Sequence, residues 1–211
     1  MSYLEENSVD IAVLQETWLN KGDKNILAEI SEYGYNVYKS SRQSKANGGG
    51  VAILGKSSIN ISPIELGRYK TFESISCNVK LKDAIIKLSN IYRLPYSQQH
   101  RYTASMFNDE FEQYLDKYLD LPGHNMICGD FNLHVENTHD RQSLLFLDLI
   151  QMNNLTQLID VPTHSHGGTL DLVISDNFSV LPLENISVDT DFDASDHYPI
   201  SFDILCEIPN T

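Results

Sequence analysis

The hydrophobic positions of this chain fall into short runs, and several of these runs border acidic or amide residues. Residues 10–14 and 125–128 have the length and apolar content of buried strands, whereas residues 198–205 alternate between apolar and polar positions. The first run leads into Gln15-Glu16-Thr17-Trp18 and the second into Gly129-Asp130-Phe131-Asn132, while Ser195-Asp196-His197 precedes the third. We call these three short polar segments the polar islands. If the strands belong to one sheet system, the polar islands lie together at one edge of it, which we call the rim.

The rest of the pattern predicts mostly strands, with two clear helices. Residues 105–119 and 141–152 place apolar side chains at helical spacing, and a third, less regular helix covers 24–33. Further strands are expected near 34–39, 49–54, 58–64, 74–81, 84–91 and 169–175. Strands in both hairpin-like and helix-separated arrangement predict an α/β fold, a four-layer α/β sandwich with two packed sheets and helices outside.

Length and composition agree with one domain. The 211 residues are 41% hydrophobic and no Pro/Gly/Ser-rich linker divides them, so we expect a single domain over residues 1–211.

The sequence has no apolar stretch long enough to span a membrane and no signal-peptide pattern, which favours an intracellular protein. Cys77, Cys128 and Cys206 lie in apolar runs, so we expect buried reduced thiols and not a metal site.

The formal net charge of −14 is unusual for a protein that binds nucleic acid. An acidic surface repels phosphate out to about a Debye length, ~8 Å at physiological salt, so the chain cannot rely on global attraction to DNA. Local cations remain: Arg42 and Lys45 precede a glycine-rich strand, and Arg93 follows Tyr92. We predict that Arg42, Lys45 and Arg93 contact a phosphate backbone, although residues 39–45 equally suit a solvated loop.

The side chains of the three polar islands suit a divalent cation and a phosphodiester. Carboxylates bind hard cations, and amide and imidazole groups bind phosphate oxygens. The residues expected at this rim are Glu16, Asp130, Asn132, Asp196 and His197. Each island also has a simpler interpretation, because a strand-end acid is often only solvated and Gly, Asp and Asn are common turn formers.

Six short segments are spread along nearly the whole chain: Gln15-Glu16-Thr17-Trp18-Leu19, Gly48-Gly49-Gly50-Val51-Ala52-Ile53, Asn90-Ile91-Tyr92-Arg93-Leu94-Pro95, Gly129-Asp130-Phe131-Asn132, Thr169-Leu170-Asp171-Leu172-Val173-Ile174-Ser175 and Ser195-Asp196-His197. In this order they resemble the endonuclease/exonuclease/phosphatase superfamily, most of all the apurinic-type endonuclease domain of non-LTR (LINE-like) retrotransposons. One such match is weak, but six ordered matches are specific. The resemblance implies a DNase I-like four-layer fold.

The resemblance also implies roles for the site residues. Glu16 would be the principal ligand of Mg²⁺ or Mn²⁺, and Asp196 a second carboxylate of the metal site. Asp130 would orient or deprotonate the attacking water, while Asn132 would donate to a phosphate oxygen and fix that water. Tyr92 would donate its hydroxyl to the scissile phosphate, unless it is simply a buried core tyrosine.

His197 and Asp171 are distant in the sequence, so we expect their side chains to become neighbours only in the folded structure. A carboxylate bonded to one imidazole nitrogen would fix the tautomer and favour the imidazolium, which would stabilise charge growing on the phosphorus. Asp171 lies in the apolar run 170–174 and therefore needs a partner, although strand alternation could also turn it to solvent.

Two other motifs are tempting, and we reject both. Residues 189–193 mimic the start of an EF-hand loop, but Ala194 replaces the turn glycine and Ile200 stands where the bidentate Glu belongs, so we expect a flexible acidic loop. His164 and His166 would share a strand face, yet no Cys or third His is nearby to complete a zinc site. We expect this segment to be a loop that approaches substrate.

The chain departs from the family at its N-terminus. Family members begin with an additional strand that carries a metal-site Asn, whereas residues 1–7 resemble only the tail of the helix that follows it. We therefore expect this strand to be missing and one sheet to carry an exposed gap or edge.

These features predict a divalent-metal-dependent DNA endonuclease that uses Mg²⁺ or Mn²⁺. The expected partners are DNA and a reverse transcriptase domain of the same retrotransposon. We expect the protein to act in the nucleus and not at a membrane. A phosphatase or sphingomyelinase-like phosphodiesterase is the alternative within the superfamily. A catalytically inactive remnant that acts as a binding module is the alternative of another class.

Overall fold

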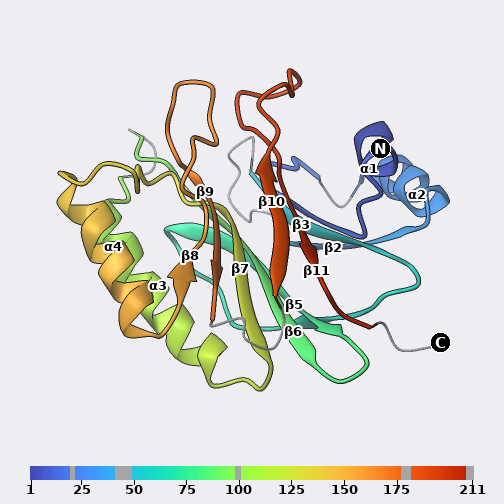
Figure 1. Cartoon of the computed structure of the whole chain (residues 1–211), viewed down its shortest axis with the longest axis horizontal. Helices are drawn as coiled ribbons and strands as arrows, with labels where there is room; N and C mark the ends of the chain where they lie inside the picture. The colour runs from blue at the N-terminus through green and yellow to red at the C-terminus, as the bar shows by residue number, and fades with distance from the viewer. Residues whose placement is uncertain (20–21, 41–48, 98–100, 177–181, 208–211) are drawn as a thin grey trace.

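The computed structural model describes residues 1–19, 22–40, 49–97, 101–176 and 182–207. Over these residues the chain forms four layers, which Figure 1 shows from one side to the other. Helices α3 and α4 cover one face of a central sheet, and two smaller sheets cover the other face. Helices α1 and α2 lie outside the smaller sheets. The expected four-layer α/β sandwich is thus confirmed.

The central sheet has six strands in the order β4-β5-β6-β7-β9-β8. Strands β6 and β7 are parallel, and all other neighbours in this sheet are antiparallel. The strands are β4 Asn60–Ile64, β5 Phe72–Lys80, β6 Ile85–Arg93, β7 His124–Asp130, β8 Thr156–Gln157 and β9 Asp171–Ser175. The helices on its outer face are α3 Ala104–Leu119 and α4 Arg141–Met152.

The second layer consists of a three-stranded sheet, β1-β3-β2, and a two-stranded sheet, β10-β11. Within the described residues β1 pairs with β3 alone and β11 with β10 alone, so both strands have an edge without a neighbour. The elements are α1 Ser2–Glu6, β1 Ile11–Leu14, α2 Lys24–Glu32, β2 Tyr35–Ser40, β3 Val51–Lys56, β10 Leu183–Val188 and β11 Ile200–Ile204.

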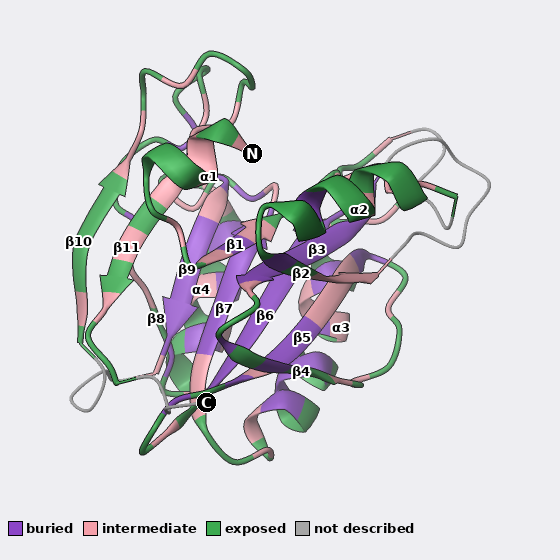
Figure 2. Ribbon diagram, turned by 90° about the vertical axis from the view of Figure 1, so that its right-hand side faces the viewer, coloured by how far each residue is buried: buried purple, intermediate pink, exposed green. Residues whose placement is uncertain are grey.

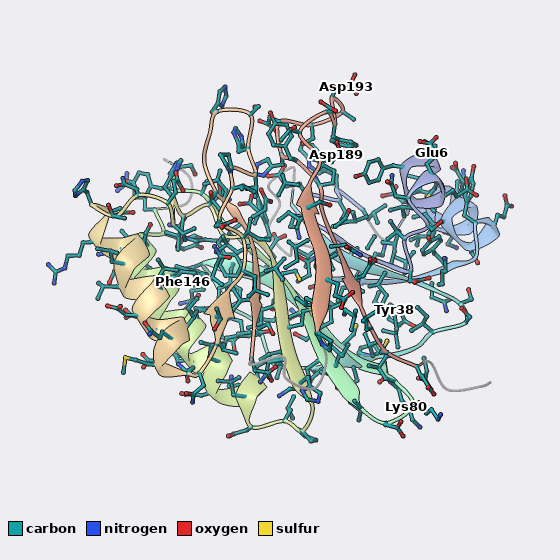
Figure 3. All side chains as sticks on the ribbon, viewed as in Figure 1. Glu6, Tyr38, Lys80, Phe146, Asp189 and Asp193 are labelled. Atoms are coloured by element: carbon teal, nitrogen blue, oxygen red, sulfur yellow. The ribbon has the colours of Figure 1, made fainter. Side chains whose placement is uncertain are left out.

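Aromatic side chains fill the space between α3, α4 and the central sheet. Phe107, Phe111, Tyr114 and Tyr118 of α3 are completely buried. Phe146 of α4 is also completely buried, with its ring 5.2 Å from that of Phe131 (Figure 3). Burial of such rings is the largest apolar contribution available to a core, so these contacts hold the helices against the sheet.

A second core lies between the central sheet and the smaller sheets, and Figure 2 shows the buried strands of the centre against the more exposed β10 and β11. Cys77 and Cys128 are buried free thiols in this region, as expected. Cys206 is exposed, so the expectation that all three thiols are buried is wrong. Cys206 follows the end of β11, where the chain no longer packs on the core.

The three expected helices are confirmed, as are the expected strands, whose ends shift by a few residues. Strands β8 and β10 were not expected. β8 has only two residues, and β10 is mostly exposed and carries a register shift between Glu184 and Ser187, so neither has a clear apolar pattern. None of the described helices is long and apolar enough to cross a membrane.

Gly129 brings the two strands that carry the site into close contact. It has a φ of 144°, and a Cβ built on it would lie 1.9 Å from the carbonyl oxygen of Ile91. Only glycine permits this approach of β7 to β6. The parallel register then places Tyr92 opposite Asp130 at the ends of the two strands.

Candidate active site

Strand register gathers the first polar side chains at one rim of the central sheet. Tyr92 at the end of β6 is opposite Asp130 at the end of β7, and Asp130 is opposite Asp171 at the start of β9. The backbone of His197 joins this group through an isolated β-bridge with His164. Four segments far apart in the sequence therefore meet at this rim.

Asp171 and His197 form the central ion pair of the rim. Oδ2 of Asp171 lies 2.8 Å from Nδ1 of His197, and both side chains are partly buried. The hydrogen bond to Asp171 outweighs burial and raises the pKa of His197 to about 9. The imidazole is therefore charged at neutral pH, with Nδ1 committed to Asp171.

Asp130 is the most buried carboxylate of the rim, with 6% of its surface exposed. Burial and the nearby charge of Asp171 raise the pKa of Asp130 to about 7, although His197 and the backbone N–H of Asn132 act in the opposite direction. A carboxylate that titrates near neutral pH suits proton transfer to or from water.

Asn132 holds Asp130 in place. Its backbone N–H donates to Asp130 Oδ1 at 2.9 Å, and its side-chain Nδ2 donates to Asp130 Oδ2 at 3.0 Å and to the carbonyl oxygen of Arg93 at 2.8 Å. Both amide protons are thus engaged within the protein, which differs from the expected donation to a phosphate oxygen. Asn132 also has a φ of 47°, a conformation that non-glycine residues rarely adopt.

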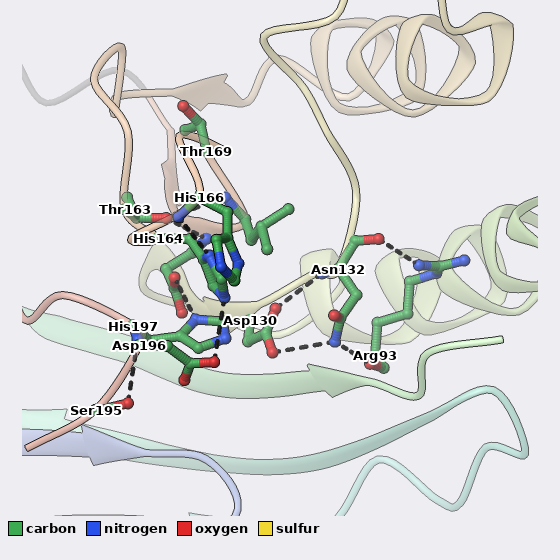
Figure 4. A network of polar contacts seen from close by, with 12 residues as sticks. Arg93, Asp130, Asn132, Thr163, His164, His166, Thr169, Ser195, Asp196 and His197 are labelled. Atoms are coloured by element: carbon green, nitrogen blue, oxygen red, sulfur yellow. Dashed lines mark hydrogen bonds and ion pairs between the residues drawn. The ribbon is translucent and has the colours of Figure 1, made fainter. Parts of the chain in front are cut away.

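Arg93, which we expected to contact a phosphate backbone, is buried in the structure. Only 6% of it is exposed, and its guanidinium donates to the carbonyl oxygen of Asn132 at 2.7 Å, as Figure 4 shows. The same group lies 5.4 Å from the ring centre of Phe107. Arg93 therefore supports the loop after β7, and this placement argues against a direct contact with DNA. Arg42 and Lys45 lie outside the described residues.

Glu16 follows β1 of the second layer, and its side chain lies at the rim of the central sheet. The hydroxyl of Tyr92, which is 4% exposed, donates to Glu16 Oε1. Glu16 has a φ of 49°, so its backbone is in the left-handed region, as that of Asn132 is. Two of the six non-glycine residues with a positive φ in the described part of the chain, Glu16 and Asn132, thus lie among the candidate site residues.

Asn90 is a supporting residue to which the sequence assigned no role. It is completely buried on β6, and its Nδ2 donates to the carbonyl oxygens of Leu14 at 2.8 Å and Ala52 at 2.9 Å. Its Oδ1 accepts from Nε2 of Gln15 at 2.7 Å. These bonds connect the two sheets immediately before Glu16. An amide in an otherwise apolar strand was the available signal, because a buried amide requires partners.

Two groups of side chains have the composition and spacing to hold a metal ion within the described residues. One is Asp130, Asp171 and His197, and the other is His164, Asp196 and His197. Neither includes Glu16, whose carboxylate accepts from Tyr92 instead. The carboxylates gathered at this rim fit a hard divalent cation, because the ligand atoms of each group lie within 4.8 Å of one another.

The structure corrects one exclusion made from the sequence. A third histidine does lie beside His164, because the rings of His164 and His197 are 4.7 Å apart. The Asp196 side chain, expected as a metal ligand, is 66% exposed and lies 3.4 Å from Nε2 of His164. The contact joins residues that are distant in sequence, so local spacing could not reveal it.

Comparisons with known proteins show the family and the fold of this chain. Residues 1–197 match the model of the endonuclease/exonuclease/phosphatase family. No curated protein matches the sequence. Among solved structures, the endonuclease domain of TRAS1, a telomere-specific non-LTR retrotransposon, is similar with a TM-score of 0.73 and 16% identity, covering 95% of this chain and 88% of that chain.

Two further solved structures have the same overall fold. The 3′ phosphatase NExo from Neisseria, bound to a product DNA hairpin, gives a TM-score of 0.73 at 18% identity and covers 96% of this chain and 91% of that one. The AP endonuclease LMAP from Leishmania major gives 0.73 at 15% identity and covers 99% of this chain and 81% of that one. At these identities the likeness concerns the fold.

Proposed function

Because this chain belongs to the endonuclease/exonuclease/phosphatase family, whose fold is typical of metal-dependent phosphodiesterases and nucleases, we propose that it hydrolyses the phosphodiester backbone of DNA. The activity is that of an endonuclease of the non-LTR retrotransposon type. Support comes from the six ordered sequence segments and from the fold shared with the TRAS1 endonuclease domain. DNA is the substrate, and a reverse transcriptase domain of the same element is the expected partner in the nucleus.

The observation that carries this proposal is the Asp171–His197 pair beside Asp130. With a pKa of about 9, His197 is an imidazolium at neutral pH and stabilises negative charge that grows on phosphate oxygens during attack. Asp130, with a pKa of about 7, accepts a proton from the attacking water. A base that accepts a proton from water and an imidazolium that stabilises charge on phosphate oxygens both contribute to hydrolysis of a phosphodiester.

The other site residues position these groups. Asn132 holds both oxygens of Asp130, and Arg93 holds the loop that carries Asn132. The family resemblance assigns Glu16 and Asp196 as the residues that would hold Mg²⁺ or Mn²⁺, although only Asp196 belongs to a group with ligand spacing. The ion when bound supplies charge stabilisation for the phosphate. Tyr92 orients Glu16 and contacts the scissile phosphate. We further propose that residues 1–211 act as one domain.

Nicking of supercoiled plasmid DNA tests this function. We expect nicking in Mg²⁺ or Mn²⁺, none in chelator, and loss of activity in Glu16→Gln with an unchanged thermal melt, because the amide loses most of its attraction for a hard cation. Glu29→Gln is the matched control, since Glu29 is an exposed acid on α2. Full nicking in chelator would remove the metal-dependent mechanism, and full nicking by Glu16→Gln would remove Glu16 as a metal ligand.

A phosphatase or sphingomyelinase-like phosphodiesterase is the second candidate, favoured by the net charge of −14 and the burial of Arg93. Both features weaken attraction to a long polyanion but not to a single phosphate group. Release of inorganic phosphate from a 3′-phosphorylated oligonucleotide, without plasmid nicking, would identify this activity. Failure of both assays while DNA still binds would indicate a non-catalytic binding module.

A further inference from the structure

The loop of residues 163–168, which precedes β9, is bonded along its backbone to the segment that carries Asp196 and His197. The N–H of Ser165 donates to the carbonyl oxygen of Asp196 at 2.8 Å, and the N–H of Tyr198 donates to that of Thr163 at 2.7 Å. Between these bonds His164 and His197 form a β-bridge. The loop therefore fixes the backbone of both site residues.

The same loop also fixes the beginning of β9. Thr163 is completely buried, and its Oγ1 accepts from the backbone N–H of Leu170 at 3.0 Å and of Asp171 at 3.0 Å. Asp171 and His197, which form the central ion pair, are thus both anchored to Thr163 and its neighbour. A change of conformation in the loop would alter the site from two sides.

The side chain of His164 points into this arrangement, as Figure 4 shows. Its Nδ1 accepts from the backbone N–H of His166 at 3.1 Å, which leaves Nε2 as the nitrogen that can donate. That nitrogen lies 3.4 Å from Oδ2 of Asp196, and the ring stands edge-on to His197 at 87°. The His164 side chain is 13% exposed, so neighbouring residues hold it, whereas that of Asp196 is 66% exposed.

We propose that His164 is a positioning residue for the metal site, which orients the carboxylate of Asp196 through its Nε2–H and supports the ring of His197. This inference rests on the proposed function, in which Asp196 binds the cation. An exposed carboxylate samples several rotamers, and a donor with a set tautomer restricts it to the orientation suited to the cation. His164 also has the spacing of a metal ligand, but we assign it to positioning because its Nδ1 accepts from the N–H of His166 and its Nε2 faces Oδ2 of Asp196.

Binding of Mn²⁺ to the whole chain tests the proposal, measured by electron paramagnetic resonance of the free ion. We expect His164→Phe, which keeps a ring but no donor, to weaken Mn²⁺ binding roughly 10–100-fold. His164→Gln, whose side-chain amide can donate to Asp196, should restore most of the affinity. His166→Ala is the matched control and should bind as the unchanged protein does, because its backbone N–H still sets the tautomer of His164.

The outcomes separate this inference from the proposed function. Equal Mn²⁺ affinity in His164→Phe and the unchanged protein overturns the positioning role, as does a His164→Gln protein that melts normally but binds as weakly as His164→Phe. Restoration by His164→Gln supports the role, since a purely structural defect of the ring would not be repaired by an amide. No Mn²⁺ binding by the unchanged protein overturns the metal-dependent function, and the inference falls with it.

Discussion

Oδ2 of Asp171 lies 2.8 Å from Nδ1 of His197, although 26 residues separate them along the chain. Asp171 is placed by the pairing of β9 with β7, and His197 by its bridge to His164. Both placements involve the loop of residues 163–168, because Thr163 Oγ1 also accepts from the backbone N–H of Asp171. The charge state of His197 therefore reports on the integrity of the whole rim.

The first prediction concerns the pKa of His197. Asp171 raises it to about 9, so Asp171→Asn should return the pKa toward the unperturbed histidine value of about 6.5. A titration of the imidazole Cε1–H resonances in metal-free protein measures both values. A His197 resonance that already titrates near neutral pH in the unchanged protein would contradict the ion pair.

The second prediction is the pH dependence of stability that follows from this pair. Because the pKa of His197 is raised on folding from about 6.5 to about 9, its stabilisation is fully present below about pH 6.5 and is lost as the pH rises through 9. Asp171→Asn should thus lower the free energy of unfolding by about 1–2 kcal/mol at pH 6 for this partly exposed pair. Urea titrations at pH 6 and pH 10 should show a smaller difference at pH 10.

The third prediction concerns the catalytic coupling of the pair. His197→Ala and Asp171→Ala should each reduce the rate of nicking by orders of magnitude, because the imidazolium acts only when its carboxylate holds and charges it. The double variant should be little slower than the slower single variant, as for residues that act as a unit. Losses that add in this double-mutant cycle would show that the two residues act independently.

The fourth prediction concerns Gly129. An alanine there would place Cβ 1.9 Å from the Ile91 carbonyl oxygen at a φ of 144°, so Gly129→Ala should destabilise the fold by about 3–5 kcal/mol. Gly22→Ala is the control, because no atom lies within 4 Å of a Cβ at that position. Thermal melts of both variants measure the difference, and equal midpoints would disprove the close approach of β6 and β7.

The fifth prediction concerns salt dependence of DNA binding. With a net charge of −14 and Arg93 buried, few cations are available for phosphate, so the slope of log K against log salt should be shallow, on the order of −2 to −4. Replacing Arg42 and Lys45 together should flatten it further if residues 39–45 follow the backbone. Unchanged affinity in that variant would exclude this segment as a DNA contact.

Local patterns sufficed for most helices and strands, although not for β8 and β10, and they indicated the chemistry of the rim. The helical spacing in 105–119 and 141–152 predicts α3 and α4, and the apolar runs before Glu16 and Asp130 predict β1 and β7, because a strand or helix buries one face whatever it packs against. The partnership of Asp171 with His197 was also expected, since an acid in an apolar strand requires a partner.

Only the tertiary structure decided how several of these side chains are used. Arg93 is turned inward to carbonyl oxygens, both amide protons of Asn132 are engaged, and His164 gains Asp196 and His197 as neighbours. These contacts depend on sheet register and loop conformation, which join residues from separate segments. Hydrophobic periodicity determines which face of each element is buried, but packing between elements determines which polar groups meet.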